Sequence, residues 1–210
     1  MTKVYIDETE VVPLLTQKKL PRFTIFEILS AIAGERANVR DGIDAPSVTG
    51  FETWRWGVRF LREHEVLQKN GWLICEKDQI SGIFHPELNM KLSVMTTDRN
   101  TGTSKAPRNL TEKGPATCKL IDLNSGQHMF EFIKSAPPPA DLWFLCPYFC
   151  DLYIAAEISR PSLQIGGVVR DYSERIIVAK PYDLPGIRKH HSVPEDFAEV
   201  ARPTIRRKVI

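Results

Sequence analysis

The chain has 210 residues, of which 42% are apolar and 26% are charged, and its formal net charge is +2. This composition is typical of a globular protein and excludes a disordered or fibrous chain. Because the net charge is close to zero, long-range attraction of the whole molecule to a polyanion is excluded as well. Any nucleic-acid surface must therefore come from local clustering of cations.

The cysteines and the N-terminus favour a cytoplasmic protein. The four cysteines contain no Cys-x-x-Cys pair: Cys75, Cys118, Cys146 and Cys150. The N-terminal run MTKVYIDETEVV lacks the cationic and apolar regions of a signal peptide. The longest apolar run, 142–156, is too short to span a bilayer and contains Pro147 and Asp151. We therefore expect free thiols, a cytoplasmic location and no membrane partner.

The first predicted helix begins near residue 24. Thr24 and Glu27 have the spacing of a capping box, and Phe23 and Ile28 have that of a hydrophobic staple. Apolar residues then recur at helical spacing as far as Gly34: Ile25, Ile28, Leu29 and Ile32. The polar segment 35–48 predicts a loop or one short helical turn.

A second helix is predicted over 49–70, where Thr49 and Glu52 repeat the capping box and Asn70-Gly71 ends the pattern. At about 100° per residue, four cations share one stripe of this helix: Arg55, Arg59, Arg62 and Lys69. Apolar residues flank the stripe on both sides: Trp54, Val58 and Leu61 on one, Trp56, Phe60 and Leu67 on the other. The helix should pack deeply and turn its basic stripe outward.

The remainder of the chain is predicted to be mostly β. A hairpin over 72–84 and a strand over 88–95 precede a long polar loop, 96–116. Further strands are expected at TCKLIDL (117–123) and HMFEFI (128–133), around a turn at Asn124-Ser125-Gly126. After the proline connector 135–141, strands are expected within LWFLC, LYIAAEI, QIGGVV and ERIIVA, between residues 142 and 179.

These elements predict an α+β fold with three segments. Residues 1–90 form a helical, winged-helix-like lobe that ends in a hairpin wing. Residues 91–180 form a larger, mostly antiparallel β lobe, which carries the polar loop. Residues 181–210 form an extended, proline-containing basic tail that ends in ARPTIRRKVI.

The stretch from PRFTIFEILSAIA to DQISGIFH resembles winged helix-turn-helix modules in the order of its elements and in the run FLREHEVLQKNGWLI. The segment 35–48 departs from that family because it shows no clear second helix. The resemblance implies that the helix over 49–70 enters the major groove while the hairpin touches the backbone or minor groove. Arg55, Arg59 and Arg62 would then contact guanine edges or phosphates.

A plain solvated helix face explains the same stripe. Residues 51–70 hold four cations against three acids, and Arg59 and Glu63 have the spacing at which opposite charges pair on a helix. The loop 96–116 offers a second set of candidate phosphate contacts, opposed by Asp98 and Glu112: Arg99, Lys105, Arg108 and Lys113. A solvent-exposed loop without a ligand is the alternative there.

The sequence predicts no metal, no cofactor and no catalytic site. Cys146 and Cys150, with Cys118 and His128, lack the ligand spacing of structural zinc, and buried thiols explain them better. A nuclease site at Asp122, Glu131 and Lys134 fails because strand residues three apart point to opposite faces. The common phosphate, dinucleotide and hydrolase motifs are absent from the sequence.

Two further runs, TGTSKAPRNLTEKGPAT (101–117) and ISRPSLQIGGVVRDYSERIIV (158–178), are similar to stretches of uncharacterised small proteins of bacterial phages and mobile elements. We therefore expect a non-catalytic DNA- or RNA-binding protein from such an element, alone or as a subunit of a nucleoprotein complex. A protein-interaction module or an inhibitor of a host complex is the alternative, and an enzyme with an unrecognised site is the third.

Overall fold

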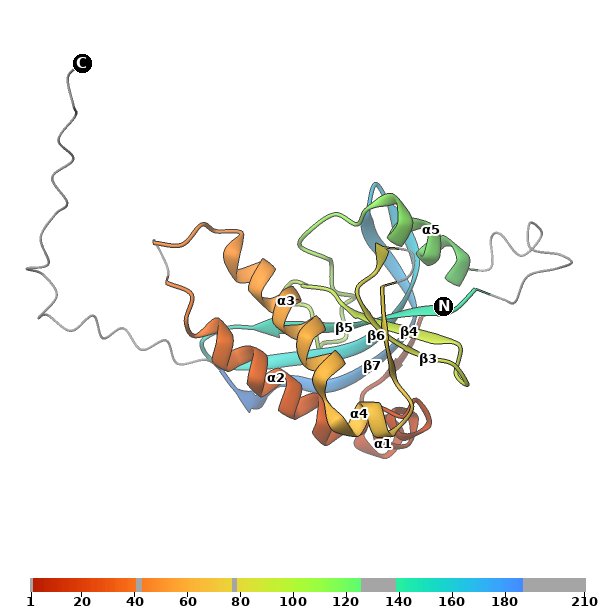
Figure 1. Ribbon diagram of the computed structural model, residues 1–210. Coiled ribbons are helices and arrows are strands. Elements are labelled where there is room, and N and C mark those ends of the chain that lie inside the picture. The colour runs from red at the N-terminus through yellow and green to blue at the C-terminus, as the bar shows by residue number, and fades with distance from the viewer. Residues whose placement is uncertain (1, 41–42, 77–78, 126–138, 187–210) are drawn as a thin grey trace, which may run out of the picture.

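The computed structural model describes residues 2–40, 43–76, 79–125 and 139–186 (Figure 1). Over these ranges the chain forms five helices and seven strands. In chain order they are β1 (Lys3–Tyr5), α1 (Glu8–Gln17), α2 (Arg22–Arg36), α3 (Val48–Glu63), α4 (Glu65–Lys69), β2 (Leu73–Cys75), β3 (Gly82–His85), β4 (Met90–Val94), α5 (Pro115–Asn124), β5 (Asp141–Phe149), β6 (Tyr153–Ile165) and β7 (Val168–Pro185).

The seven strands form one mixed sheet in the order β1-β7-β6-β5-β4-β3-β2. Only β1 with β7 and β4 with β5 run parallel, and the other four neighbouring pairs are antiparallel. The predicted α+β class, with helices mainly in the N-terminal part and a larger, mostly antiparallel sheet, is confirmed. Strands from both predicted lobes are hydrogen-bonded within this one sheet.

One face of the sheet is covered by α1, α2 and α3, and Figure 1 shows α2 and α3 lying side by side across it. The apolar stripe that predicts α2 forms the centre of this core, because Ile25, Ile28, Leu29 and Ile32 are each at most 1% exposed. They meet inward-facing sheet residues such as Leu145. The main hydrophobic core therefore lies between these helices and the sheet.

The opposite face has a smaller apolar cluster, built on β5 and α5. Side chains alternate along β5, so that Trp143 and Leu145 face the three helices while Phe144 and Cys146 face the other side. The rest of this face is covered by the segment between β4 and α5. This segment has few apolar side chains, so polar contacts must hold it in place.

Several local predictions for the helices are wrong. The helix α2 begins after Pro21, so Thr24 lies inside it, fully buried, and Phe23 is 57% exposed and forms no staple. Thr49 likewise lies inside α3 and caps nothing. The predicted helix over 49–70 is two helices, because His64 adopts an extended conformation, with φ −69° and ψ 113°, between α3 and α4.

The hairpin over 72–84 and the strand over 88–95 are confirmed as β2–β3 and β4. The run TCKLIDL is a helix, α5, and the predicted strand there is wrong; Gly114 and Pro115 begin the helix. The run QIGGVV is two strand ends joined by a turn rather than one strand: its first two residues end β6, its last two begin β7, and Gly166 and Gly167 between them both have positive φ, 59° and 79°. The predicted strand HMFEFI and the basic tail from residue 187 lie outside the described residues.

Candidate functional site

The exposed cations of the predicted stripe are ion-paired on their own helical stretch. Arg55 lies 3.3 Å from Glu52, Arg59 lies 3.0 Å from Glu63, and Lys69 lies 3.0 Å from Glu65. The side chains of Arg55, Arg59 and Lys69 are 50%, 52% and 75% exposed, so the stripe does face outward as predicted. Much of its charge is offset locally by neighbouring carboxylates.

Arg62 has a structural role within the stripe. Its side chain is 19% exposed, and its guanidinium donates to the carbonyl oxygens of Gly82 and Cys75 at 3.2 and 3.0 Å. It also pairs with Glu76 at 2.9 Å. Arg62 therefore ties α3 to the β2–β3 hairpin, and a ligand could engage it only by breaking these contacts.

The second predicted set of cations lies on the segment that covers the sheet between β4 and α5. Residues 96–113 form what is named here the basic loop. Its two ends run antiparallel, joined by a bridge between Thr97 and Asn109 and by the Asp98 amide, which donates to the Arg108 carbonyl at 3.0 Å. These contacts join the two ends of the loop to each other.

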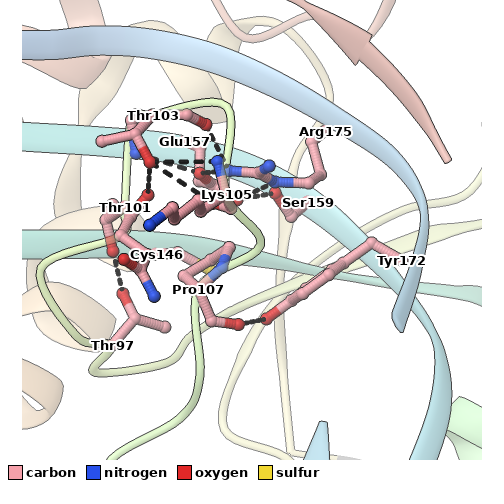
Figure 2. A network of polar contacts seen from close by, with 12 residues as sticks. Thr97, Thr101, Thr103, Lys105, Pro107, Cys146, Glu157, Ser159, Tyr172 and Arg175 are labelled. Atoms are coloured by element: carbon pink, nitrogen blue, oxygen red, sulfur yellow. Dashed lines mark hydrogen bonds and ion pairs between the residues drawn. The ribbon is translucent and has the colours of Figure 1, made fainter. Parts of the chain in front are cut away.

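A buried ion pair anchors the tip of the basic loop (Figure 2). Glu157 on β6 and Arg175 on β7 are 0% and 1% exposed, and the two side chains meet at 2.6 and 2.9 Å. The Glu157 carboxylate also accepts the Gly102 amide at 3.0 Å, and Arg175 donates to the Thr103 carbonyl at 3.0 Å. Each charge is therefore satisfied partly by its partner and partly by loop backbone.

Two neutral side chains complete the attachment. The Tyr172 hydroxyl on β7 donates to the Pro107 carbonyl at 3.0 Å. The Asn109 amide group donates to the Gly167 carbonyl at 2.9 Å and accepts the Val169 amide at 2.8 Å. Because both its tip and its base are hydrogen-bonded to β6 and β7, the basic loop is held in one conformation.

Three of the loop's cations lie at the surface, unlike these buried anchors. Arg99, Lys105 and Arg108 are exposed, and within the described part of the chain none of them forms an ion pair. The basic loop thus differs from the helical stripe: its backbone is fixed by buried groups, while its charges remain available to an anion.

A hollow of about 870 Å³ lies between the N-terminal half of α3, the end of β5 and the base of the basic loop. Its aromatic lining comes from two elements, with Phe51 and Trp54 on α3 and Tyr148 and Phe149 on β5. The described residues that line it include no aspartate or glutamate. A smaller groove of about 420 Å³, lined by Arg55 and Arg59, adjoins it and shares Trp54.

Lys113, the fourth predicted loop cation, lines the larger hollow. Burial lowers the pKa of its ammonium group, which lies 5.8 Å from the centre of the Phe144 ring. The nearby Cys146 thiol is fully buried, and burial raises its pKa well above the ordinary value, so it stays neutral. No carboxylate pairs with Lys113 among the residues the structure describes.

Arg36 of α2 adds a second cation to the wall of the hollow. Its guanidinium donates to the Thr49 carbonyl at 3.0 Å and to the Thr53 hydroxyl, and it stacks on the Phe149 ring at 4.8 Å. Arg36 thus joins α2, α3 and β5 where they meet the hollow.

The cysteines hold no visible ion site. Their four thiols are free, and the described residues contain no group of three or more potential ligands arranged for a metal. The Cys146 and Cys150 thiols donate to the backbone carbonyls of Phe144 and Tyr153. His128, Glu131 and Lys134 lie outside the described residues.

Glu157, Arg175 and Arg36 are not among the site residues predicted from the sequence. The signal for the first two was a charged residue within an otherwise apolar strand, in LYIAAEI and in ERIIVA. Such a residue is buried only when it is paired, which implies a partner elsewhere in the chain.

Comparison with known proteins supplies no further guide, because no family model, no curated protein and no solved structure matches this chain. None of the described helices is both long and apolar enough to cross a membrane.

Proposed function

We propose that the protein is a non-catalytic nucleic-acid-binding protein and that it binds a single strand of DNA or RNA. The observation that supports this most is the basic loop, which offers three exposed cations on a backbone fixed by buried Glu157 and Arg175. Proteins that bind single strands combine such cations with aromatic side chains on which bases stack.

Aromatic side chains of this kind line the larger hollow at the base of the loop. Phe51 and Trp54 are 54% and 38% exposed, and their ring centroids lie 6.0 Å apart. Trp54 borders both the larger hollow and the smaller groove. A strand that stacks on these rings would place its phosphates within a surface bounded by the basic loop on one side and by Arg55 and Arg59 on the other.

Within this surface the loop cations should contribute more to affinity than the helical stripe. Arg55 and Arg59 must exchange their contacts with Glu52 and Glu63 for contacts with phosphate, which reduces the net gain. The exposed loop cations have no ion pair to lose among the residues that the structure describes, and the fixed backbone limits the entropy lost on binding.

The experiment measures binding of a labelled single-stranded oligonucleotide by fluorescence anisotropy at low salt. Substitution of Arg99, Lys105 and Arg108 by Gln should weaken binding by at least about tenfold. The matched control replaces three exposed lysines elsewhere, Lys3, Lys19 and Lys119, by Gln and should stay near wild type. Equal losses in both variants, or no binding by the wild type, would refute the proposal.

The proposal also includes the cellular location and the origin of the protein. A cytoplasmic location is supported by the four free thiols, which suit a reducing compartment. An origin in a bacterial phage or mobile element rests on the sequence resemblance of residues 101–117 and 158–178, and the winged-helix resemblance of the first third of the chain remains a prediction.

A second candidate function, docking to another protein subunit, is favoured by the edge strand β2. Leu73 and Ile74 are 54% and 65% exposed there, and among the described strands β2 has a neighbour on one side only. Edge strands of this kind accept a further strand from a partner. A stoichiometric partner that survives nuclease treatment and is lost in the Ile74→Lys variant would support this function, whereas a partner retained by that variant would argue against it.

A further inference from the structure

The larger hollow combines aromatic lining residues with a cation, Lys113, that has no carboxylate partner among the described residues. Phe51 and Trp54 line it from α3, Tyr148 and Phe149 line it from the end of β5, and Thr49 and Thr111 are also among its lining residues. Its volume of about 870 Å³ lies within the range typical of small-molecule sites. The walls suit a planar ring, and the hydroxyls suit a polar substituent such as a sugar.

Lys113 defines the charge of a ligand for this hollow. Its side chain is half-buried without a carboxylate partner among the described residues, and this burial disfavours the charged ammonium. A bound anion would restore the missing interaction. The absence of aspartate and glutamate from the described lining residues means that no described group would repel that anion.

We propose that this hollow binds a nucleoside monophosphate, with its base against Phe51 and Trp54 and its phosphate at Lys113. Two ligands have this chemistry: a free mononucleotide and the phosphorylated end of a strand. Binding of a strand end rests on the proposed function, whereas binding of a free mononucleotide does not.

The test uses adenosine 5′-monophosphate and adenosine as probes, with affinities measured by isothermal titration calorimetry. Wild-type protein should bind the monophosphate at least about tenfold more tightly than the nucleoside, because a charge-assisted contact is formed only with the phosphate. Lys113→Gln should remove this preference for the monophosphate over the nucleoside, and Lys113→Arg should restore most of it. Lys119→Gln, an exposed lysine on α5, is the matched control and should behave as wild type.

A second variant tests the aromatic wall independently. Trp54→Leu should weaken both probes by a similar factor, about tenfold, because it removes a stacking surface and leaves Lys113 in place. Thermal melting of each variant shows whether it is folded. Failure of the wild type to bind the monophosphate, or a phosphate preference that persists in Lys113→Gln, would overturn the inference.

Two further measurements separate this inference from the proposed function. The Arg99, Lys105 and Arg108 to Gln variant should lose oligonucleotide binding but keep its affinity for the monophosphate. If the wild type binds the monophosphate and no oligonucleotide, the proposed function fails while the inference stands. A preference for a 5′-phosphorylated oligonucleotide over its 5′-hydroxyl form that disappears in Lys113→Gln identifies the strand end as the source. Equal binding of the two forms identifies the free nucleotide.

Discussion

Lys113 carries its ammonium group into partly buried surroundings, where burial lowers the pKa. Since the pKa is lower in the folded than in the unfolded chain, the unfolded chain binds more protons, and stability rises as the pH increases toward the ordinary lysine pKa. Near neutral pH this lysine therefore opposes folding. We expect Lys113→Met to raise Tm by about 2–4 °C near neutral pH, and by less in alkaline buffer. A lower Tm in thermal melts would mean that Lys113 supports the fold.

Arg62 and Arg59 lie on the same stripe but make different contacts. Arg62 donates to two backbone carbonyls of the β2–β3 hairpin, whereas Arg59 forms an exposed pair with Glu63 and lies 5.0 Å from the centre of the Trp56 ring on its own helix. Arg62→Gln should lower the free energy of unfolding by about 1–3 kcal/mol. Arg59→Gln should change it by less than about 0.5 kcal/mol. Urea unfolding monitored by tryptophan fluorescence distinguishes them, and equal effects would contradict the structural role assigned to Arg62.

Among the elements, the basic loop depends on a single buried carboxylate. Glu157 accepts hydrogen bonds from Arg175, from the Ser159 hydroxyl and from the Gly102 amide. Glu157→Gln would leave Arg175 buried with an uncompensated charge, and we expect a loss of about 3–5 kcal/mol. Hydrogen exchange should show the largest loss of protection in residues 98–106. Uniform loss across the chain, with the loop unaffected relative to the rest, would contradict the anchor.

A double variant serves as the control for that anchor. Glu157→Leu combined with Arg175→Met removes both charges and leaves an apolar interior, so it should be less destabilised than Glu157→Gln. It should nevertheless free the loop, because the contacts to the Gly102 amide and the Thr103 carbonyl are gone.

Hydrophobic periodicity correctly predicted elements whose position depends on the local sequence. The spacing of Ile25, Ile28, Leu29 and Ile32 located α2, because a helix must bury such a stripe. Capping signals misled because Thr24 and Thr49 occupy positions inside helices, where packing decides their place. The run TCKLIDL is apolar enough for a strand, and only the Gly114-Pro115 pair indicated a helix start.

The candidate site could be predicted only in part, because its geometry depends on contacts between segments that are distant in the sequence. The cations of the stripe and of the basic loop are visible in the sequence as clusters. Which of them remain available to an anion depends on contacts between distant segments, such as those of Arg62 with Cys75 and of Arg175 with Thr103. Sequence patterns carry no information about such pairings without a related structure.

For the whole molecule, the net charge of +2 is too small to attract nucleic acid by itself. The fold class followed from composition and periodicity. The order of the strands did not, because the parallel pairing of β1 with β7 joins the two ends of the described chain. The proposed function therefore depends on how this fold distributes its charges: the exposed cations of the stripe are ion-paired with carboxylates, whereas Arg99, Lys105 and Arg108 form no ion pair within the described part of the chain.

The dependence of single-strand affinity on salt tests this distribution most directly. The logarithm of the association constant should fall with the logarithm of salt concentration with a slope of about −3 for the wild type, as expected for roughly four phosphate contacts on a single strand. Substitution of Arg99, Lys105 and Arg108 by Gln should reduce the slope to about −1, whereas substitution of Arg55 and Arg59 should change it little. A slope unchanged by the loop substitutions would contradict the account.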